Sequence, residues 1–367
     1  MKKKIVVIVF LLLTFNAITT VCYGYNISEY SAKDFLDDEA IEILKENGFE
    51  KLDFSELSDL SFSDVIKYIF KIIKTEITTP FKLIYLIFVL IVIVAIVMGI
   101  NNGFLSLQLQ QNLSIVSVLS AITIVFIPVM TCIEITKDFI KNISDFIVVF
   151  VPSFSAIILA SGRVSGALGY QSLMIAACEI IALFLSNIII PILFFYLSIS
   201  IISRTVPFFK FDNFSATLKS SITWALTLSM SLFVAFITIK GIIGAGTDSL
   251  TLRTGKFFVG NFVPVVGSAL SEAAATIGKS IGIIKDATGV FGIITVALYF
   301  IPPLIKVLLF KFTSDISSSF AAFFGIDAIC GLMKDISSVL GILSAIILSF
   351  GAVIILSTAL TIIFGGV

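Results

Sequence analysis

The chain has 367 residues, of which 58% are hydrophobic and only 13% are charged. About a quarter of the residues of a soluble globular domain are charged, so this composition excludes an ordinary soluble fold and predicts a membrane protein. The net charge is zero and there is no histidine, which excludes histidine-based acid–base catalysis and histidine metal sites.

Residues 1–24 have the features of a secretory signal peptide. Lysines follow Met1, a short apolar stretch runs over residues 5–13, and the small residues Cys22 and Gly24 suit cleavage after Gly24. The alternative is an uncleaved first transmembrane helix. The apolar stretch is shorter than the roughly 20 residues that cross a bilayer, so we favour cleavage.

Residues 25–80 form an acidic, extracytoplasmic arm. It holds 13 Asp or Glu against 6 Lys, a net charge of −7, which the rest of the chain balances. Apolar residues recur at helical spacing after Asp64, and Ser61 or Ser63 resembles an N-cap. The pattern predicts an amphipathic helix from about Asp64 to Thr78 on the membrane surface, ended by Thr79-Pro80.

Residues 81–367 are predicted to form an all-α, polytopic membrane domain. About seven apolar segments follow Pro80, and most can cross a hydrocarbon core of roughly 30 Å as helices. They cover residues 83–100, 114–133, 146–161, 173–202, 222–239, 290–310 and 339–364. The third segment is short, and the long fourth segment contains Pro191, where we expect a tilt or kink.

Seven simple crossings conflict with the distribution of positive charge. If the arm is outside, residues 203–220 would also be outside, yet they carry Arg204, Lys210 and Lys219 and should prefer the cytoplasm. Either a re-entrant third segment or a fourth segment that bends back removes the conflict. The sequence leaves both alternatives open.

Residues 246–286, between the fifth and sixth segments, are too apolar for an ordinary connection. Gly260, Gly267, Gly278 and Gly282 permit close backbone contact or bends, and Pro264 cannot donate a helical hydrogen bond. Irregular backbone at membrane depth is tolerated only against protein or a water-filled cavity. We therefore predict a re-entrant or interfacial hairpin over residues 246–286 that packs on the helix bundle.

The sequence of this stretch also resembles that of a known protein family. The run Leu250-Thr-Leu-Arg-Thr-Gly-Lys256, with Gly260-Asn-Phe-Val-Pro-Val-Val-Gly267 and Ser271-Glu272, resembles the signature of the stage III sporulation protein AE family. The resemblance extends through Lys285, Pro302 and the polytopic C-terminal half, and the signal peptide and acidic arm suit it. Gly255 stands where another small residue such as alanine is expected, a mild departure.

The resemblance implies a membrane component of the channel-like secretion apparatus that joins mother cell and forespore in endospore-forming bacteria. The implied location is the mother-cell membrane around the forespore. The implied partners are other proteins of the stage III sporulation A operon, including an ATPase that resembles secretion motors, and the forespore protein Q.

The motif hairpin supplies the candidate residues for assembly or for a pore. They are Arg253, Lys256, Gly260, Asn261, Pro264, Gly267 and Glu272. The charged members could hold the hairpin by ion pairs, contact lipid phosphates or dock a partner, and a solvated loop face is the alternative. Small residues between Gly331 and Ala352 suit close helix packing, either within one subunit or in a homo-oligomer.

Glu179 is the candidate intramembrane charge, because it lies within the long fourth segment. An ionisable group there is costly, so it could face a water-filled path and conduct or gate. The alternative is that Glu179 lies one or two turns from the membrane surface and snorkels or pairs with Arg163.

The sequence predicts no catalytic site, no cofactor and no metal. There is no phosphate-cradling glycine loop, no nucleophile with a base and no basic aromatic patch for nucleic acid. The four cysteines fit neither a metal spacing nor a disulfide framework and are expected to be buried apolar residues. One rival function is an autonomous small-solute permease, but such transporters often contain internal repeats, and the sequence shows no convincing one. The other rival function is a purely structural membrane scaffold.

Overall fold

A computed structural model describes residues 62–100, 107–160, 164–205, 211, 213–236 and 267–364. These residues are helical almost throughout and include no strand, which confirms the predicted all-α fold. In chain order the helices are α4 (Phe62–Glu76), α5 (Thr78–Ile100), α6 (Leu107–Ala160), α7 (Val164–Phe184), the π-helix η2 (Leu185–Ile189), α8 (Ile190–Thr205), a helix at Asn213–Phe236, α10 (Gly267–Phe323) and α11 (Asp327–Phe364). The predicted signal peptide and most of the acidic arm lie outside the described residues.

The predicted surface helix is α4, which begins and ends two residues earlier than expected. It is amphipathic, and Phe70, Lys71 and Lys74 are exposed. Pro80 does not end α4 but lies in the first turn of α5, where its missing N–H removes no helical hydrogen bond. Arm and membrane domain are thus joined by two helices that meet at Ile77.

Six helical courses among the described residues are long and apolar enough to cross a membrane. They cover Thr78–Gly99, Asn112–Ala160, Ala167–Thr205, Asn213–Phe236, Thr288–Phe323 and Asp327–Ala359. The predicted second and third segments share the single helix α6, and the predicted fourth segment runs without reversal through α7, η2 and α8. The seven apolar segments therefore fall on six helical courses in the described part of the chain, and six crossings there would need neither alternative left open by the sequence.

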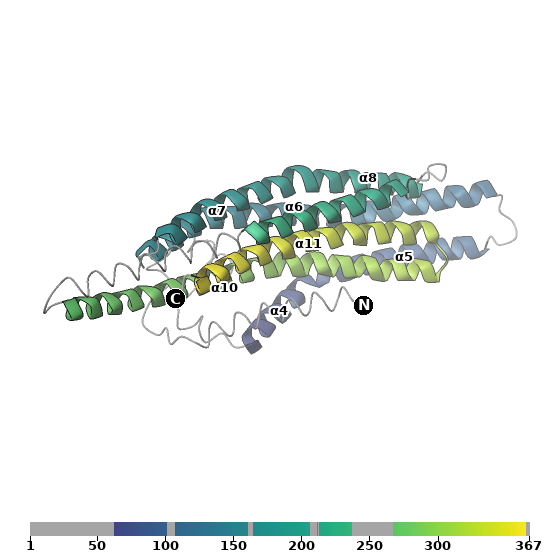
Figure 1. The fold of residues 1–367 in the computed structure, drawn as a ribbon. Coiled ribbons are helices and arrows are strands. Elements are labelled where there is room, and N and C mark those ends of the chain that lie inside the picture. The colour runs from purple at the N-terminus through teal and green to yellow at the C-terminus, as the bar shows by residue number, and fades with distance from the viewer. Residues whose placement is uncertain are drawn as a thin grey trace.

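Successive courses alternate in direction along an elongated bundle (Figure 1). One end, here called the basic end, is where α8 ends, the Asn213–Phe236 helix begins and α10 turns into α11. Arg204 and Lys219 therefore lie at the opposite end of the α7–α8 course from its start at Val164. With an external arm, six passages place the basic end on the cytoplasmic side, as the distribution of positive charge requires.

The core of the bundle is built around α11. In the most apolar stretch of α11, 72% of the residues are buried, against 22% in the corresponding stretches of α5 and of the Asn213–Phe236 helix. Cys132, Cys178 and Cys330 are buried in this core, as predicted for the cysteines that the structure describes. The hairpin of α10 and α11 is thus the centre, and α5 and the Asn213–Phe236 helix are the periphery.

The long α7–α8 course deviates from α-helix just before Pro191. The five residues of η2 adopt a π-helical turn, and α8 begins at Ile190. Proline has no N–H to donate to the carbonyl one turn earlier, so the helix locally widens instead of keeping its ordinary hydrogen bonds. The irregularity expected at Pro191 is this π-turn.

Candidate functional site

The predicted motif hairpin is only partly described. Arg253, Lys256, Gly260, Asn261 and Pro264 lie outside the described residues. Gly267 is the first residue of α10, and Glu272 follows in its second turn, with a side chain that is likewise outside the described part. Residues 267–286 form the start of one long helix, and neither Gly278 nor Gly282 interrupts it.

Glu179 lies on the outside of α7. It is exposed, as are its neighbours along the same helix face, Ala176, Ile180 and Leu183. It is 15 residues, about four turns, from the helix start at Val164. Arg163 is outside the described residues, and among those described the carboxylate of Glu179 makes no ion pair or hydrogen bond.

Lys285 is buried at the end of the bundle opposite the basic end. Its side chain is 1% exposed, its Nζ atom lies 3.2 Å from Asp286 Oδ1, and it donates a hydrogen bond of 3.4 Å to the carbonyl oxygen of Ile362. A buried charge is costly unless it is paired and hydrogen-bonded. These contacts therefore tie the first part of α10 to the last turns of α11.

At the basic end, α10 and α11 are linked through polar side chains. Lys311 Nζ donates to Asp315 Oδ2 at 2.7 Å and to Ser337 Oγ at 3.3 Å. Ser337 in turn donates to the other carboxylate oxygen of Asp315. Each of the three groups thus bonds to the other two, which is the arrangement that satisfies a partly buried charge.

Two neighbouring residues of α11, Asp335 and Ser338, bond to α8 and to the Asn213–Phe236 helix. Arg204 Nε in the last turn of α8 donates to Asp335 Oδ2 at 3.1 Å, and Lys219 Nζ in the Asn213–Phe236 helix donates to Ser338 Oγ at 2.8 Å. We call these four residues, with Lys311, Asp315 and Ser337, the polar network. One turn of α11 therefore meets α8, the Asn213–Phe236 helix and α10 by hydrogen bonds.

Gly331 of α11 makes room for a cation of the polar network, and Gly341 lies in ordinary contact with another. A Cβ atom on Gly331 would lie 2.7 Å from Arg204 Nε, and a Cβ atom on Gly341 would lie 3.4 Å from Lys311 Cε. Gly351, further along α11, packs against the ring of Phe300. The close packing predicted for the small residues of this segment is thus observed within one subunit.

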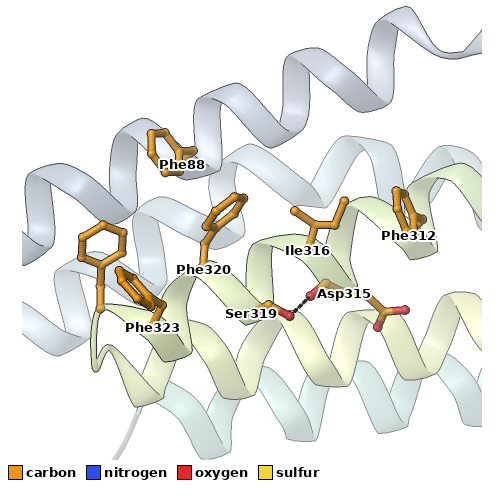
Figure 2. Close-up of a pocket in the computed structure, with 8 residues that line it drawn as sticks. Phe88, Phe312, Asp315, Ile316, Ser319, Phe320 and Phe323 are labelled. Carbon is orange, nitrogen blue, oxygen red and sulfur yellow. Dashed lines mark hydrogen bonds between the residues drawn. The ribbon is translucent and has the colours of Figure 1, made fainter.

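An outer groove of about 680 Å³ lies between α5 and the end of α10. Figure 2 shows Phe88 of α5 above Phe312, Ile316, Phe320 and Phe323 of α10. Phe88 and Phe320 meet edge to face, with ring centroids 5.1 Å apart. The groove is apolar apart from Asp315 and Ser319, and Asp315 also belongs to the polar network.

Sequence reasoning missed the polar network. It treated Arg204 and Lys219 as part of a basic loop, and Asp335 to Ser338 precede the predicted last segment. The spacing of Lys311 and Asp315, four residues apart, was a readable local signal for an ion pair. The bonds of Arg204 and Lys219 join residues more than a hundred positions apart, and no periodicity in one sequence encodes such a contact.

Comparison with known proteins adds the family. The model of the family described as stage III sporulation protein AE matches residues 49–365. The chain is 24% identical over 263 residues to Stage III sporulation protein AE of Bacillus subtilis (strain 168), covering 71% of this chain and 66% of that protein, a little under two thirds. No solved structure matches the chain.

Proposed function

The chain belongs to the stage III sporulation protein AE family, and from this premise we propose that it is an integral membrane subunit of a sporulation channel or secretion complex. The complex links mother cell and forespore and is needed for forespore development. Within it the protein crosses the mother-cell membrane around the forespore. Its role is one of assembly and passage, without catalysis.

The length of α6 is the observation that carries the idea of a multiprotein complex. Its 54 residues make a helix of about 81 Å, whereas a whole bilayer is only about 40–45 Å thick. Fitting such a helix into one bilayer needs a tilt well beyond the usual limit of about 40°. Part of the bundle therefore projects from the membrane.

Charged residues in the middle of α6 mark the boundary between the part of the bundle in the membrane and the part that projects from it. Exposed charged residues interrupt its middle and leave an apolar stretch on either side: Glu134, Lys137, Asp138, Lys141 and Asp145. The part with α5 and the Asn213–Phe236 helix has the most exposed apolar surface, which suits lipid. The projecting part still exposes Val148, Leu159 and Leu168, and apolar side chains outside a bilayer call for a protein cover.

The proposed cover is supplied by the partners that the family resemblance implies. These are other products of the stage III sporulation A operon and the forespore protein Q. The secretion-type ATPase of the operon, which is also an implied partner, hydrolyses ATP and would therefore bind on the cytoplasmic side. With the basic end in the cytoplasm, the projecting part stands on the same side as the acidic arm. That side faces the forespore in the proposed location.

Affinity purification from sporulating cells tests the proposal. The tagged full chain is compared with L159N/L168N, which makes the projecting surface polar, and with L228N/L232N, the same change on the Asn213–Phe236 helix. We expect the wild type and the L228N/L232N control to recover the other A-operon products, and L159N/L168N to lose most of them. Each variant is checked for a single symmetric peak in size-exclusion chromatography.

Two results would overturn the proposal. One is recovery of the wild-type protein without any other A-operon product. The other is solute flux through liposomes that contain this protein alone, which would support an autonomous permease.

A further inference from the structure

The polar network leaves positive charge at the basic end. Asp335 pairs with Arg204 and Asp315 pairs with Lys311, so both carboxylates are already matched. Lys219 bonds to the neutral hydroxyl of Ser338. Together with Lys334, four cations face two carboxylates in and beside the network, and Asp327 at the start of α11 leaves this end with an excess charge of +1 among the described residues.

Lys219 and Lys334 lie on either side of one turn of α11. The hydroxyl of Ser338 receives the Lys219 ammonium and donates to the backbone carbonyl of Lys334, which places Lys334 one turn earlier on the same helix face. Both lysines are exposed, and among the described residues neither has a carboxylate within ion-pair distance. Asp327 is about two turns from Lys334, at the start of α11, where a carboxylate stabilises the helix N-terminus.

We propose that Lys219 and Lys334 bind the phosphate of an anionic phospholipid head group in the cytoplasmic leaflet, while Ser338 holds Lys219 against α11. The two ammonium groups are donors that match the oxygens of a phosphate. Basic pockets between transmembrane helices on the cytoplasmic side are typical sites for anionic head groups. The ligand class is thus an acidic glycerophospholipid such as phosphatidylglycerol or cardiolipin.

The surroundings favour a lipid over a free anion or an acidic protein segment. Next to the lysines, the Asn213–Phe236 helix and α8 expose large apolar side chains, including Phe195 and Phe214, whose rings meet edge to face at 6.5 Å. Trp224, one turn beyond Lys219, is 67% exposed, as tryptophan is where helices meet the membrane interface. A phosphate bound here brings acyl chains against that apolar surface.

This inference uses the membrane location and orientation of the bundle but not the role in a secretion complex. A protein that fails to recover A-operon partners can still bind acidic lipid at the basic end. Conversely, loss of lipid binding leaves the partner test unchanged. The two failures are therefore distinguishable.

Trp224 is the chain's single tryptophan and serves as the reporter. The full-length protein is reconstituted into vesicles of phosphatidylcholine with a small, varied fraction of a brominated lipid, which quenches nearby tryptophan fluorescence. We expect brominated phosphatidylglycerol to reach half-maximal quenching at a roughly thirtyfold lower mole fraction than brominated phosphatidylcholine, the size of effect that two interfacial lysines produce. Addition of 10 mM inorganic phosphate as the probe for a free-anion site should leave this preference in place.

Charge variants decide the assignment to these residues. K219Q/K334Q should reduce the preference to about twofold or less, and K219R/K334R should restore it because the charge returns. K137Q/K141Q, which removes two exposed lysines from α6, should keep the full preference. K219Q also removes a hydrogen bond to α11, so the single variant K334Q is tested as well. For K334Q, the logarithm of the ratio between the two half-maximal mole fractions should fall to half of the wild-type value or less.

Three outcomes would overturn the proposal: equal quenching by the two brominated lipids, an unchanged preference in both K219Q/K334Q and K334Q, or displacement of the lipid by inorganic phosphate. The last result would assign the lysines to a free anion.

Discussion

The two halves of α11 are held in different ways. At the basic end, Asp335, Ser337 and Ser338 bond to side chains of three other helices. Towards the other end, besides the hydrogen bond from Lys285 to the carbonyl oxygen of Ile362, aromatic rings of neighbouring helices lie against glycine, as Phe300 does against Gly351. Directional bonds fix the register of a helix, whereas close apolar packing fixes volume, so one helix shows what each kind of contact contributes.

The largest effect is expected in the apolar part of the bundle away from the basic end, at Gly292 of α10, which faces Phe150 of α6. A Cβ atom there would lie within 2.8 Å of three carbon atoms of the Phe150 ring, which is buried and stacked between Phe146 and Phe154. Since the ring is confined on both faces, we expect Gly292→Ala to lower the free energy of unfolding by about 2–3 kcal/mol. Reversible denaturation in detergent micelles, followed by circular dichroism, measures it.

Gly282 on the same helix is the matched control. A Cβ atom on Gly282 meets nothing within 4 Å. Alanine is the better helix former by about 1 kcal/mol, so Gly282→Ala should leave stability unchanged or raise it. Equal destabilisation by the two substitutions would show that helix backbone effects, and not contact with Phe150, dominate.

In the polar half, the largest effect is expected from Asp335. Asp335→Ala leaves the guanidinium of Arg204 without this carboxylate, and the two side chains are 17% and 29% exposed. Because water reaches the pair in part, we expect a loss of about 1–2 kcal/mol, below the loss at a fully buried pair. Thermal unfolding of D335A, R204A and the double variant measures the coupling between them.

The double variant decides whether the bond itself matters. If the bond is responsible, R204A/D335A should be more stable than the sum of the single losses allows, by about 0.5 kcal/mol or more. Strict additivity would contradict a direct interaction. Raising the salt concentration should weaken the wild type more than the double variant.

Substitutions at Gly331 and Gly341 test the polar half of α11 further, with smaller expected changes in stability. A Cβ atom on Gly331 would lie within 2.9 Å of three guanidinium atoms of Arg204. That group is the far end of a flexible side chain, so Gly331→Ala should cost only about 0.5–1 kcal/mol through the disturbed bond to Asp335. Differential scanning fluorimetry should show that this cost disappears when Arg204 is already alanine.

Gly341→Ala is the control for Gly331→Ala and should change the free energy of unfolding very little. Its Cβ atom would lie 3.4 Å from Lys311 Cε, an ordinary contact distance. A loss at Gly341 as large as that at Gly331 would count against the role of Arg204. So would a cost of Gly331→Ala that persists in the R204A background.

The same contrast explains what could be read from the sequence. The apolar segments, the amphipathic α4 and the irregularity near Pro191 follow from local composition and periodicity. The fusion of two segments into α6 was missed because the charges at Glu134 to Asp145 read as a break, although charged side chains on one outer face do not interrupt a helix. The bond between Arg204 and Asp335 depends on how distant helices are arranged, which no local rule supplies.

The smallest effect is expected where α4 joins the bundle. Lys306 Nζ lies 3.0 Å from Glu76 Oε2, and both side chains are about 30% exposed. Ion pairs with this access to water contribute about 0.2–1 kcal/mol and are screened by salt. Glu76→Gln should therefore lower the melting temperature only slightly at low salt and not at all at 1 M salt, with Lys74→Gln, an exposed change on the same helix, as control.

A melting temperature lowered by many degrees in E76Q would contradict this ranking. It would mean that the join between α4 and α10 acts as a polar anchor comparable to Arg204 and Asp335, although neither half of α11 takes part in it. A small, salt-sensitive shift would instead show that the polar contacts that matter are those made by α11. In that case the directional bonds that fix the bundle are concentrated at the basic end, where three helices meet one turn of α11.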